Sequence, residues 1–369
     1  MDRRQAIGHI GAGALGVLTG GCVYRPRPRV AGAARGPRPL MPVRVSAAQV
    51  IRTVVGLRPF RAPGFVVRAE RFNDKLVIHD YGHGGGGVTL SWGTAQMAVE
   101  EAQQTEADDI AIVGCGVIGL STARLLQRRG RRVTIYAAAM PPDTTSNIAG
   151  AQWTPFSVFS PDAMTPAFEA QFQRATRLAY RTFQEYVGPR YGVRWVDNWY
   201  VGDEPIRVPP FLEALPDVFP DREDVPRGQH PFGSRHAHRV STMFIEPPRY
   251  LRALLDDVLL AGGRLIVREF RTLDELLRLP ERVIMNCTGL GARALFGDDA
   301  LVPVKGQLVV LRPQQDIDYL LLAGNLYMFP RTDGILLGGT FVSGDWSLTP
   351  DAAATQRIIE GHARLFDWS

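Results

Sequence analysis

The chain has 369 residues, of which 45% are hydrophobic and 21% charged, and its formal net charge is +5. This composition is that of a globular protein and excludes a disordered, collagenous or coiled-coil chain. The basic excess is confined to residues 1–40, which carry a net +6, whereas the rest of the chain carries a net −1. A body so close to neutrality excludes a nucleic-acid partner, because nucleic-acid binding needs a basic surface.

Residues 1–22 are predicted to be a signal peptide. Arg3 and Arg4 precede a weakly apolar stretch that resembles a twin-arginine export signal and is too short to span a bilayer. Cys22 ends an imperfect lipobox, so we expect a periplasmic protein, either cleaved without a lipid or lipid-anchored through Cys22. The alternative is an unprocessed tail on a cytoplasmic protein. Residues 23–41 are rich in Pro, Arg and Gly and predict an extended linker.

A glycine run, GHGGGGVT at residues 82–89, precedes a helix that we expect from about Ser91 to Glu101. Ordering such a run costs backbone entropy. A functional reason for it would be that the backbone passes against a flat ring or donates several N–H groups to a ligand. The N-terminus of the following helix would stabilise negative charge on a ligand. We interpret His83, inside this run, as a packing residue and not as a catalytic base.

The segment from residue 110 to 136 predicts a dinucleotide-binding loop. An apolar strand (110–113) is followed by a G-x-G-x-x-G motif at 114–119, a helical pattern that ends at Gly130, and a second strand. The three glycines permit a tight turn, close approach of a pyrophosphate, and close packing of helix on strand. An acid that binds the ribose hydroxyls is expected near Ala138, but the first carboxylate after that strand is Asp143.

Six segments resemble the D-amino-acid oxidase family of FAD enzymes, and together they cover most of the chain from residue 42. They are VVGLRPFRAPG (54–64), VIHDYGHGGGGVTLSWG (77–93), VTIYAAAMPPDTTSNIAGAQWTP (133–155), VIMNCTGLGARALFGDDALVPVKGQLVVL (283–311), NLYMFPRTDGILLGGT (325–340) and GDWSLTPD (344–351). The resemblance implies an α/β fold: an FAD-binding Rossmann-type domain and a substrate domain built on a mainly antiparallel sheet.

The order of these segments is rotated relative to the family. In the family, the segments matching 54–64 and 77–93 come last, after GDWSLTPD and a helix, whereas here they precede the glycine loop. We interpret residues 42–55 as the continuation of the helix that ends the chain. The rotated order of the segments then indicates a circular permutation of the family's chain. The alternative is a mis-assembled gene model. Termini that lie close together permit such a rearrangement.

The permutation predicts the following domain boundaries. Residues 42–105 are the transposed C-terminal segment of the family, 106–155 and 263–300 form the FAD-binding domain, and 156–262 and 301–369 form most of the substrate domain.

The resemblance also implies three substrate contacts. Arg58 would grip the substrate carboxylate through two parallel hydrogen bonds, and the Tyr327 hydroxyl would add a third. The Gly85 carbonyl would accept a hydrogen bond from the substrate amine. Some family members carry a lid tyrosine at the position of Ala323, which Tyr319 would replace here if a lid exists.

FAD contacts follow from the matching positions, and the reaction requires no acid–base residue. The expected FAD contacts are Gly84, Gly85, Gly86, Gly87, Thr89, Gly114, Gly116, Val117, Ile118, Gly119, Thr145, Ser146, Gly150, Ala151, Gln152, Phe270 and Thr288. Cys115 and Cys287 are interpreted as buried apolar residues, and no residue spacing suggests a metal site.

The implied function is oxidative deamination of D-amino acids, with hydride transfer to flavin N5 and production of a 2-oxo acid, ammonia and hydrogen peroxide from water and O2. Arg331 keeps D-aspartate open as a substrate, and a glycine- or sarcosine-type oxidase on the same fold is a further alternative. A non-catalytic flavin-binding protein is the alternative from another class. The sequence leaves the oligomeric state open, with a homodimer as one option.

Overall fold

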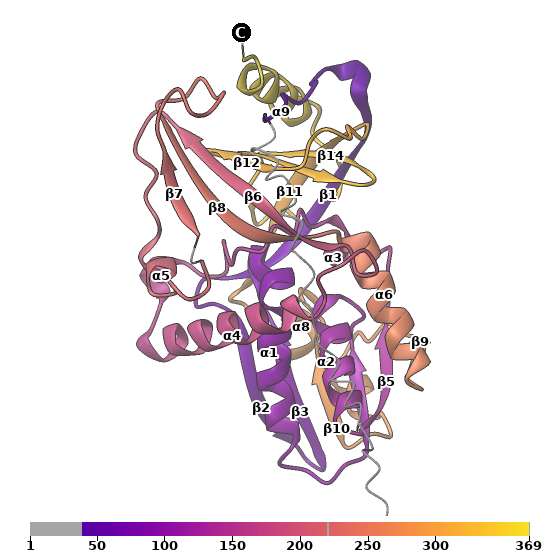
Figure 1. Cartoon of the computed structure of the whole chain (residues 1–369). Coiled ribbons are helices and arrows are strands. Elements are labelled where there is room, and N and C mark those ends of the chain that lie inside the picture. Colours follow the sequence, from indigo (N-terminus) through magenta and orange to yellow (C-terminus); the bar gives the residue numbers. More distant parts are fainter. Residues whose placement is uncertain (1–38, 220, 369) are drawn as a thin grey trace, which may run out of the picture. The chain divides into compact units, whose positions relative to one another are not determined.

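The computed structural model describes residues 39–219 and 221–368. The signal peptide expected at 1–22, and the linker up to residue 38, therefore lie outside the described residues. Within the described ranges the chain forms two β-sheets with helices packed on them (Figure 1). No helix in this part of the chain is long and apolar enough to cross a membrane.

The six-stranded sheet has the arrangement of a dinucleotide-binding fold. Its strand order is β2-β3-β10-β4-β5-β9, and only the β2–β3 pair is antiparallel. The strands are β2 (Val66–Phe72), β3 (Lys75–Tyr81), β4 (Asp109–Val113), β5 (Arg132–Ala137), β9 (Arg264–Val267) and β10 (Val283–Asn286). The central strands are almost entirely buried, as parallel strands covered on both faces should be. The predicted Rossmann-type domain is confirmed.

The second sheet is mainly antiparallel, as expected for the substrate domain. Its order is β1-β11-β14-β13-β12-β6-β8-β7, with β15 paired to β11, and only β6 and β12 run parallel to each other. The strands are β1 (Val50–Arg61), β6 (Val193–Gly202), β7 (Arg222–Val225), β8 (His236–Ile245), β11 (Leu301–Leu311), β12 (Leu320–Ala323), β13 (Leu326–Arg331), β14 (Gly334–Gly338) and β15 (Val342–Ser343).

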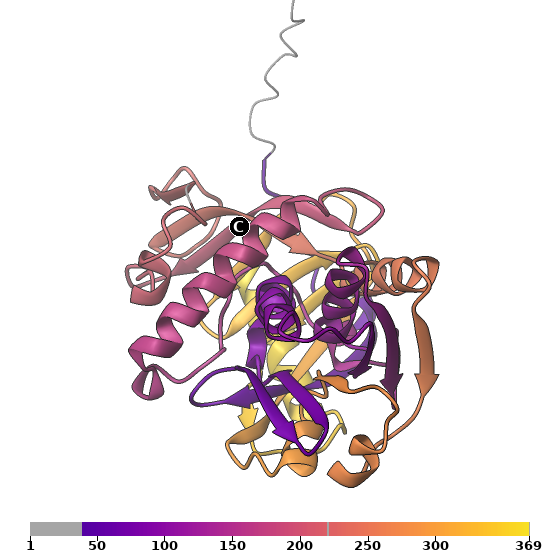
Figure 2. The ribbon, with the colours of Figure 1, turned by 90° about the horizontal axis from the view of Figure 1, so that it is seen from below.

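Helices cover both sheets, and three of them lie side by side. They are α1 (Gly87–Ala102), α2 (Val117–Arg128), α3 (Thr145–Ile148), α4 (Pro166–Gln184), α5 (Pro210–Glu213), α6 (Pro247–Leu260), α7 (Leu273–Leu277), α8 (Gly291–Phe296) and α9 (Ala352–Leu365); the 3₁₀ turns are Ala47–Gln49, Gly84–Gly86 and Pro161–Ala163. α1 packs between α2 and α4 (Figure 2). Because α1 is buried along most of its length, with Gln96, Glu100 and Glu101 only partly exposed, it is the central helix of this layer.

The segment that precedes the glycine loop contributes to both sheets. β1 pairs with β11 over its whole length, while β3 lies between β2 and β10 in the other sheet. Residues 50–102 are therefore integral to the fold and are not an appended module.

Two predictions about this segment are wrong. Residues 42–55 do not continue the C-terminal helix, because β1 begins at Val50 and α9 ends at Leu365. The β-branched run from Val50 to Val55 favours a strand, which a reading based on chain order overlooked. The helix expected from Ser91 begins four residues earlier, at Gly87, because the last glycine of the run already has helical dihedral angles.

Candidate active site

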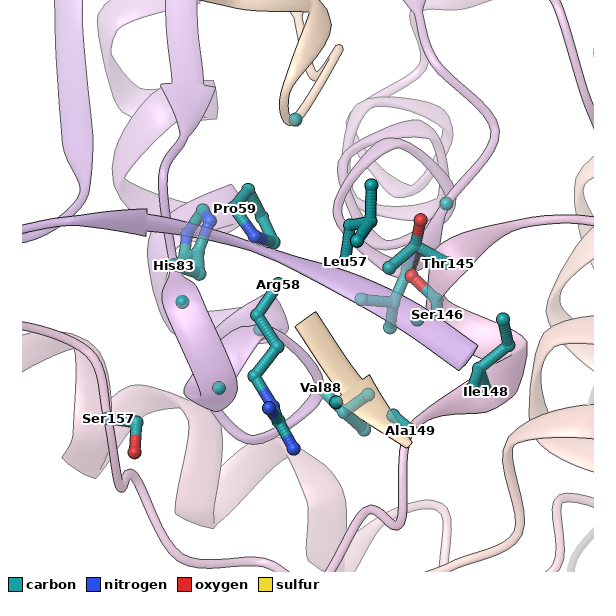
Figure 3. A pocket seen from close by; sticks show the side chains of 18 of the residues that line it. Leu57, Arg58, Pro59, His83, Val88, Thr145, Ser146, Ile148, Ala149 and Ser157 are labelled. Carbon is teal, nitrogen blue, oxygen red and sulfur yellow. Dashed lines mark hydrogen bonds between the residues drawn. The ribbon is translucent and has the colours of Figure 1, made fainter. Parts of the chain in front are cut away.

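A cavity of about 1170 Å³ opens at the carboxyl ends of β3, β10, β4 and β5 and reaches β1 and β13. It is larger than typical small-molecule pockets of roughly 300–1,000 Å³. This position, beyond the carboxyl ends of parallel strands, is where open α/β sheets bind ligands. Figure 3 shows Arg58 of β1, Val88 of α1, and Thr145 and Ser146 of α3 around the cavity.

Most of the predicted site residues line this one cavity. Those that do are Arg58, Gly84, Gly85, Gly87, Thr89, Gly114, Gly116, Val117, Ile118, Thr145, Ser146, Gly150, Ala151, Gln152, Phe270, Thr288 and Tyr327. Gly86 and Gly119 do not line it. Their lack of a side chain serves packing instead: a Cβ on Gly86 would lie 2.5 Å from Val158 Cγ2, and one on Gly119 would lie 2.0 Å from the Gly114 carbonyl oxygen.

The glycine loop between β4 and α2 has the geometry of a phosphate cradle. Gly114 has a φ of +114°, and its amide donates to the Tyr136 carbonyl at 2.8 Å, which ties the loop to β5. Gly116 is the N-cap of α2, and the Val117 amide donates to Ser146 Oγ at 3.1 Å. The N-terminus of α2, where the helix dipole is positive, therefore lies at the cavity wall, as a pyrophosphate site requires.

The glycine turn before α1 packs against the segment that follows β5 in the chain. The Gly85 amide donates to the Ser157 carbonyl at 2.9 Å. Gly84 has a φ of +54°, and a Cβ there would lie 2.1 Å from the same oxygen. Thr89, one turn into α1, donates to the Gln152 and Thr154 carbonyls at 3.4 and 3.3 Å. These contacts hold the turn rigidly at the cavity wall.

The substrate end of the cavity is built on Arg58. Its Nη2 donates to the Tyr327 hydroxyl at 3.3 Å, while its buried Nη1 has no hydrogen-bond partner among the described residues. The guanidinium packs over Gly306 of β11, where a Cβ would lie 2.5 Å from Nη1. A buried guanidinium nitrogen without a partner is costly, so this arrangement calls for an anionic ligand.

Tyr327 is held in place by its surroundings. Its ring stacks on Phe329 at a centroid distance of 5.1 Å and passes over Gly338, where a Cβ would lie 1.9 Å from the ring. His362 of α9 lies 3.1 Å from the Tyr327 carbonyl oxygen. The hydroxyl is thus positioned next to Arg58 by packing on both sides.

Two arginines in the matching segments have structural roles. Arg61 pairs with Asp298 at 2.8 Å and also donates to the Gly64 carbonyl. Arg331 is wrong as a substrate contact, because it is buried away from the cavity wall and pairs with Asp333 at 2.6 Å.

Tyr319 is also wrong as a replacement lid residue. It is 1% exposed in the core beneath β12, and its hydroxyl donates to the Met41 carbonyl at 2.8 Å. The side chain next to Arg58 at the substrate end is instead Phe341, whose ring centroid lies 5.9 Å from the Arg58 guanidinium carbon.

His83 packs in the core, as the sequence predicted. It is 2% exposed, stacks on Phe65 at 5.3 Å, and lies 3.0 Å from Thr94 Oγ1. Its Nε2 is 3.2 Å from Asp80, whose carboxylate has no hydrogen-bond partner in the described part of the chain. Burial raises the pKa of Asp80, and the nearby His83 opposes that shift.

The two cysteines of the dinucleotide segments are buried, in agreement with their predicted apolar role. Burial raises the pKa of the Cys115 thiol to about 12, and it also raises the pKa of the Cys287 thiol well above its usual value. Both thiols are therefore protonated and unreactive at neutral pH.

A parallel sheet, a glycine loop at a helix N-terminus and an adjoining pocket for an anion together define a dinucleotide-binding protein with space for a small anionic ligand. Residues 109–367 match the family described as FAD dependent oxidoreductase. The chain belongs to this family, and FAD is its cofactor. The cavity fits that cofactor, because the α2 N-terminus, the bare glycine backbone and the room beside Arg58 accommodate a phosphate, a flat ring and a substrate together.

Curated relatives carry related names. The chain is 34% identical to a D-amino-acid oxidase of Rubrobacter xylanophilus over 261 residues, which are 67% of this chain and 74% of that protein. It is 30% identical to the D-aspartate oxidase of Homo sapiens over 258 residues, 68% of this chain and 73% of that one.

A solved structure shares the fold. Glycine oxidase from Geobacillus kaustophilus has a TM-score of 0.51 and 20% identity, over 70% of this chain and 78% of that one. At this identity the likeness establishes the fold alone.

Some cavity residues escaped the sequence analysis. Tyr200 of β6 receives hydrogen bonds from Gln152 and Asn198 at 3.3 and 3.0 Å, and burial raises its pKa to about 12. Arg357 of α9 and Glu269, beyond β9, also line the cavity. None belongs to a recognisable motif, and only the tertiary fold brings them to the site.

Proposed function

We propose that this protein oxidises D-amino acids at Cα. The observation that carries the proposal is the pairing of Arg58 with Tyr327 at 3.3 Å, in the cavity that also contains the glycine loop. Arg58 Nη1 has no hydrogen-bond partner within residues 39–219 and 221–368. The names of the curated relatives support the same substrate class.

The residues act by orientation. Arg58 binds the substrate carboxylate in two parallel hydrogen bonds, with the Tyr327 hydroxyl beside it, which fixes the position and the plane of that group. The Gly85 carbonyl, on the opposite turn, accepts a hydrogen bond from the amine. With carboxylate and amine both fixed, only one enantiomer directs its Cα–H toward the cofactor. When bound beside these residues, FAD would supply the two-electron oxidant for the Cα–H bond, with O2 as the final electron acceptor.

A steady-state assay tests this proposal. Purified holoprotein is supplied with matched D- and L-amino acids, glycine and sarcosine, and peroxide production is recorded. We expect turnover with D-amino acids and none with their L-enantiomers. Faster turnover of glycine or sarcosine than of D-amino acids would show that the protein is instead an amine oxidase of the glycine or sarcosine type. Bound flavin without any turnover would contradict the proposal.

A dicarboxylic D-amino acid is the second candidate substrate. Arg357 lines the cavity, is exposed, and forms no ion pair with any described residue. It adds a guanidinium to the same cavity as Arg58, whereas Arg331 pairs with Asp333 away from the cavity wall. If this candidate is right, Arg357→Gln lowers kcat/KM for D-aspartate and D-glutamate and leaves D-alanine unchanged. An equal effect on all three would argue against it.

We also propose that the chain is circularly permuted relative to its family. The family match begins at residue 109, yet Arg58 and the glycine turn before it line the same cavity as the glycine loop. Val43 and Phe366 belong to one hydrophobic cluster, against which Trp368 packs, so the start of the transposed segment and the end of the chain contribute to the same part of the core.

Rebuilding the family order tests the permutation. A chain that runs 106–369 and then 42–104 should be soluble and bind FAD as the natural order does. A chain of 106–369 alone is the control and should fail, because it lacks β1, β3 and α1. Failure of the rebuilt chain together with folding of the control would overturn the proposal.

A further inference from the structure

Adenosine binding in this fold normally uses an acid that this chain lacks at the usual place. In dinucleotide-binding sheets, a carboxylate at the end of the second strand accepts hydrogen bonds from the ribose hydroxyls. Here the second strand, β5, is followed by Ala138 and Ala139. Both alanines line the cavity, so the ribose position is present but its acid is missing there.

The neighbouring strand supplies a carboxylate level with Ala139, one residue beyond Ala138. β9 runs parallel to β5 with Ala137 opposite Val267, and the Arg268 amide donates to the Ala137 carbonyl at 2.9 Å. This pairing carries the chain after β9 alongside the chain after β5. Glu269 therefore follows its strand by the same two residues as Ala139 does, and both line the cavity.

No other described carboxylate has this position. Apart from Glu269, the acid that lines the cavity is Asp80, at the end of β3. β3 and β9 are four strand spacings apart in the sheet, which is roughly 19 Å. Asp143, the first acid after β5, is exposed and does not line the cavity.

The Glu269 side chain has no strong partner that would hold it away from a ligand. Its carboxylate is 64% exposed and lies 3.7 Å from Arg271, beyond hydrogen-bond distance. The adjacent Arg268 is engaged, because its guanidinium carbon lies 4.6 Å above the ring of Phe270. Phe270 is itself buried at the cavity wall, so the three residues form a short segment with distinct roles.

We propose that Glu269 is the ribose-binding acid of this protein, in place of the missing one at Ala138. Its carboxylate accepts hydrogen bonds from the 2′- and 3′-hydroxyls of the adenosine in FAD. The adenosine site is thereby moved from the end of β5 to the end of β9, one strand further along the sheet. The inference rests on FAD being the cofactor, and it does not depend on which substrate is oxidised.

Release of flavin from the holoprotein tests the assignment without any turnover. On dilution, recovery of flavin fluorescence gives the dissociation constant for FAD, and the same measurement is made with bound FMN, which has no adenosine. We expect Glu269→Ala to weaken FAD binding roughly 10- to 100-fold, as loss of hydrogen bonds to a charged group does. FMN binding should be unchanged, and Asp143→Asn, the matched control, should change neither.

A rescue variant keeps the test independent of misfolding. Ala138→Asp restores an acid at the usual place, so in the Glu269→Ala background it should recover most of the lost FAD affinity. Unchanged FAD affinity in Glu269→Ala, or equal losses for FAD and FMN, would overturn the proposal. Because wild-type FAD binding is measured directly, an inactive protein that still shows the Glu269 effect would refute the proposed oxidase function and leave this assignment standing.

Discussion

The two ends of the cavity are built in different ways. The dinucleotide end consists mostly of backbone from one short stretch, β4 to α3, where glycines, a helix N-terminus and Ser146 lie within about forty residues of one another. The substrate end consists of side chains from remote segments: Arg58 of β1 and Tyr327 of β13.

This difference separates the binding of the cofactor from selectivity for the substrate. A backbone cradle tolerates changes in most nearby side chains but no change in its glycines, whereas the substrate end changes with each side chain that reaches it. The dinucleotide end therefore indicates which family the chain belongs to, and the side chains of the substrate end determine which substrate binds.

The largest effect should come from the cradle itself. A Cβ on Gly119 would lie 2.0 Å from the Gly114 carbonyl, so Gly119→Ala must displace β4 from α2. We expect a loss of about 3 kcal/mol in the free energy of unfolding, together with loss of bound flavin. Chemical denaturation and the flavin content of the purified protein measure both. Gly233→Ala is the matched control, because a Cβ there meets nothing within 4 Å.

The next largest effect should come from a substitution at the substrate end that leaves the glycine loop unchanged. Arg58→Ala removes the group that binds the carboxylate, and we expect KM to rise roughly 100- to 1,000-fold with flavin still bound. Arg52→Ala, on the same strand but paired with Asp333 at the surface, should leave KM unchanged. If KM of Arg58→Ala matched that of Arg52→Ala, Arg58 would not contact the substrate.

Acid should weaken the dinucleotide sheet through His79 of β3. Burial, with a contribution from Arg68, lowers the pKa of His79 to about 4. The folded state therefore binds fewer protons than the unfolded state between pH 6.5 and 4, so this stability is complete above pH 6.5 and is lost as the pH falls toward 4. The loss amounts to about 3 kcal/mol at most. Denaturation of His79→Gln over this range should show a shallower pH slope; an unchanged slope would exclude His79 as the cause.

The smallest effect should come from removing one hydroxyl group at the substrate end. Tyr327→Phe keeps the ring that stacks on Phe329 and removes one hydrogen bond near Arg58, so KM should rise roughly tenfold. Steady-state kinetics with one D-amino acid are sufficient to measure it. A rise as large as that of Arg58→Ala would mean that Tyr327 mainly positions the arginine.

The contrast between the two ends of the cavity also explains which parts of the site could be predicted from the sequence. The loop at 114–119 could be predicted because its function depends on backbone geometry, which glycine spacing encodes locally. Arg58 and Tyr327 could be named only through a family resemblance, since 269 residues separate them and only the sheet order β1-β11-β14-β13 brings them together. The roles of Tyr319 and Arg331 could not be predicted, because the sequence does not reveal which side of a strand faces the cavity or that Asp333 pairs with Arg331.

The most direct test of the account is reduction of the bound flavin without oxygen. Wild-type holoprotein and Arg58→Ala are mixed with one D-amino acid and its L-enantiomer, and loss of visible flavin absorbance is followed. The account predicts rapid bleaching of the wild type by the D-enantiomer only, and bleaching of Arg58→Ala only at far higher concentrations. Bleaching by the L-enantiomer, or equal bleaching of both proteins, would contradict it.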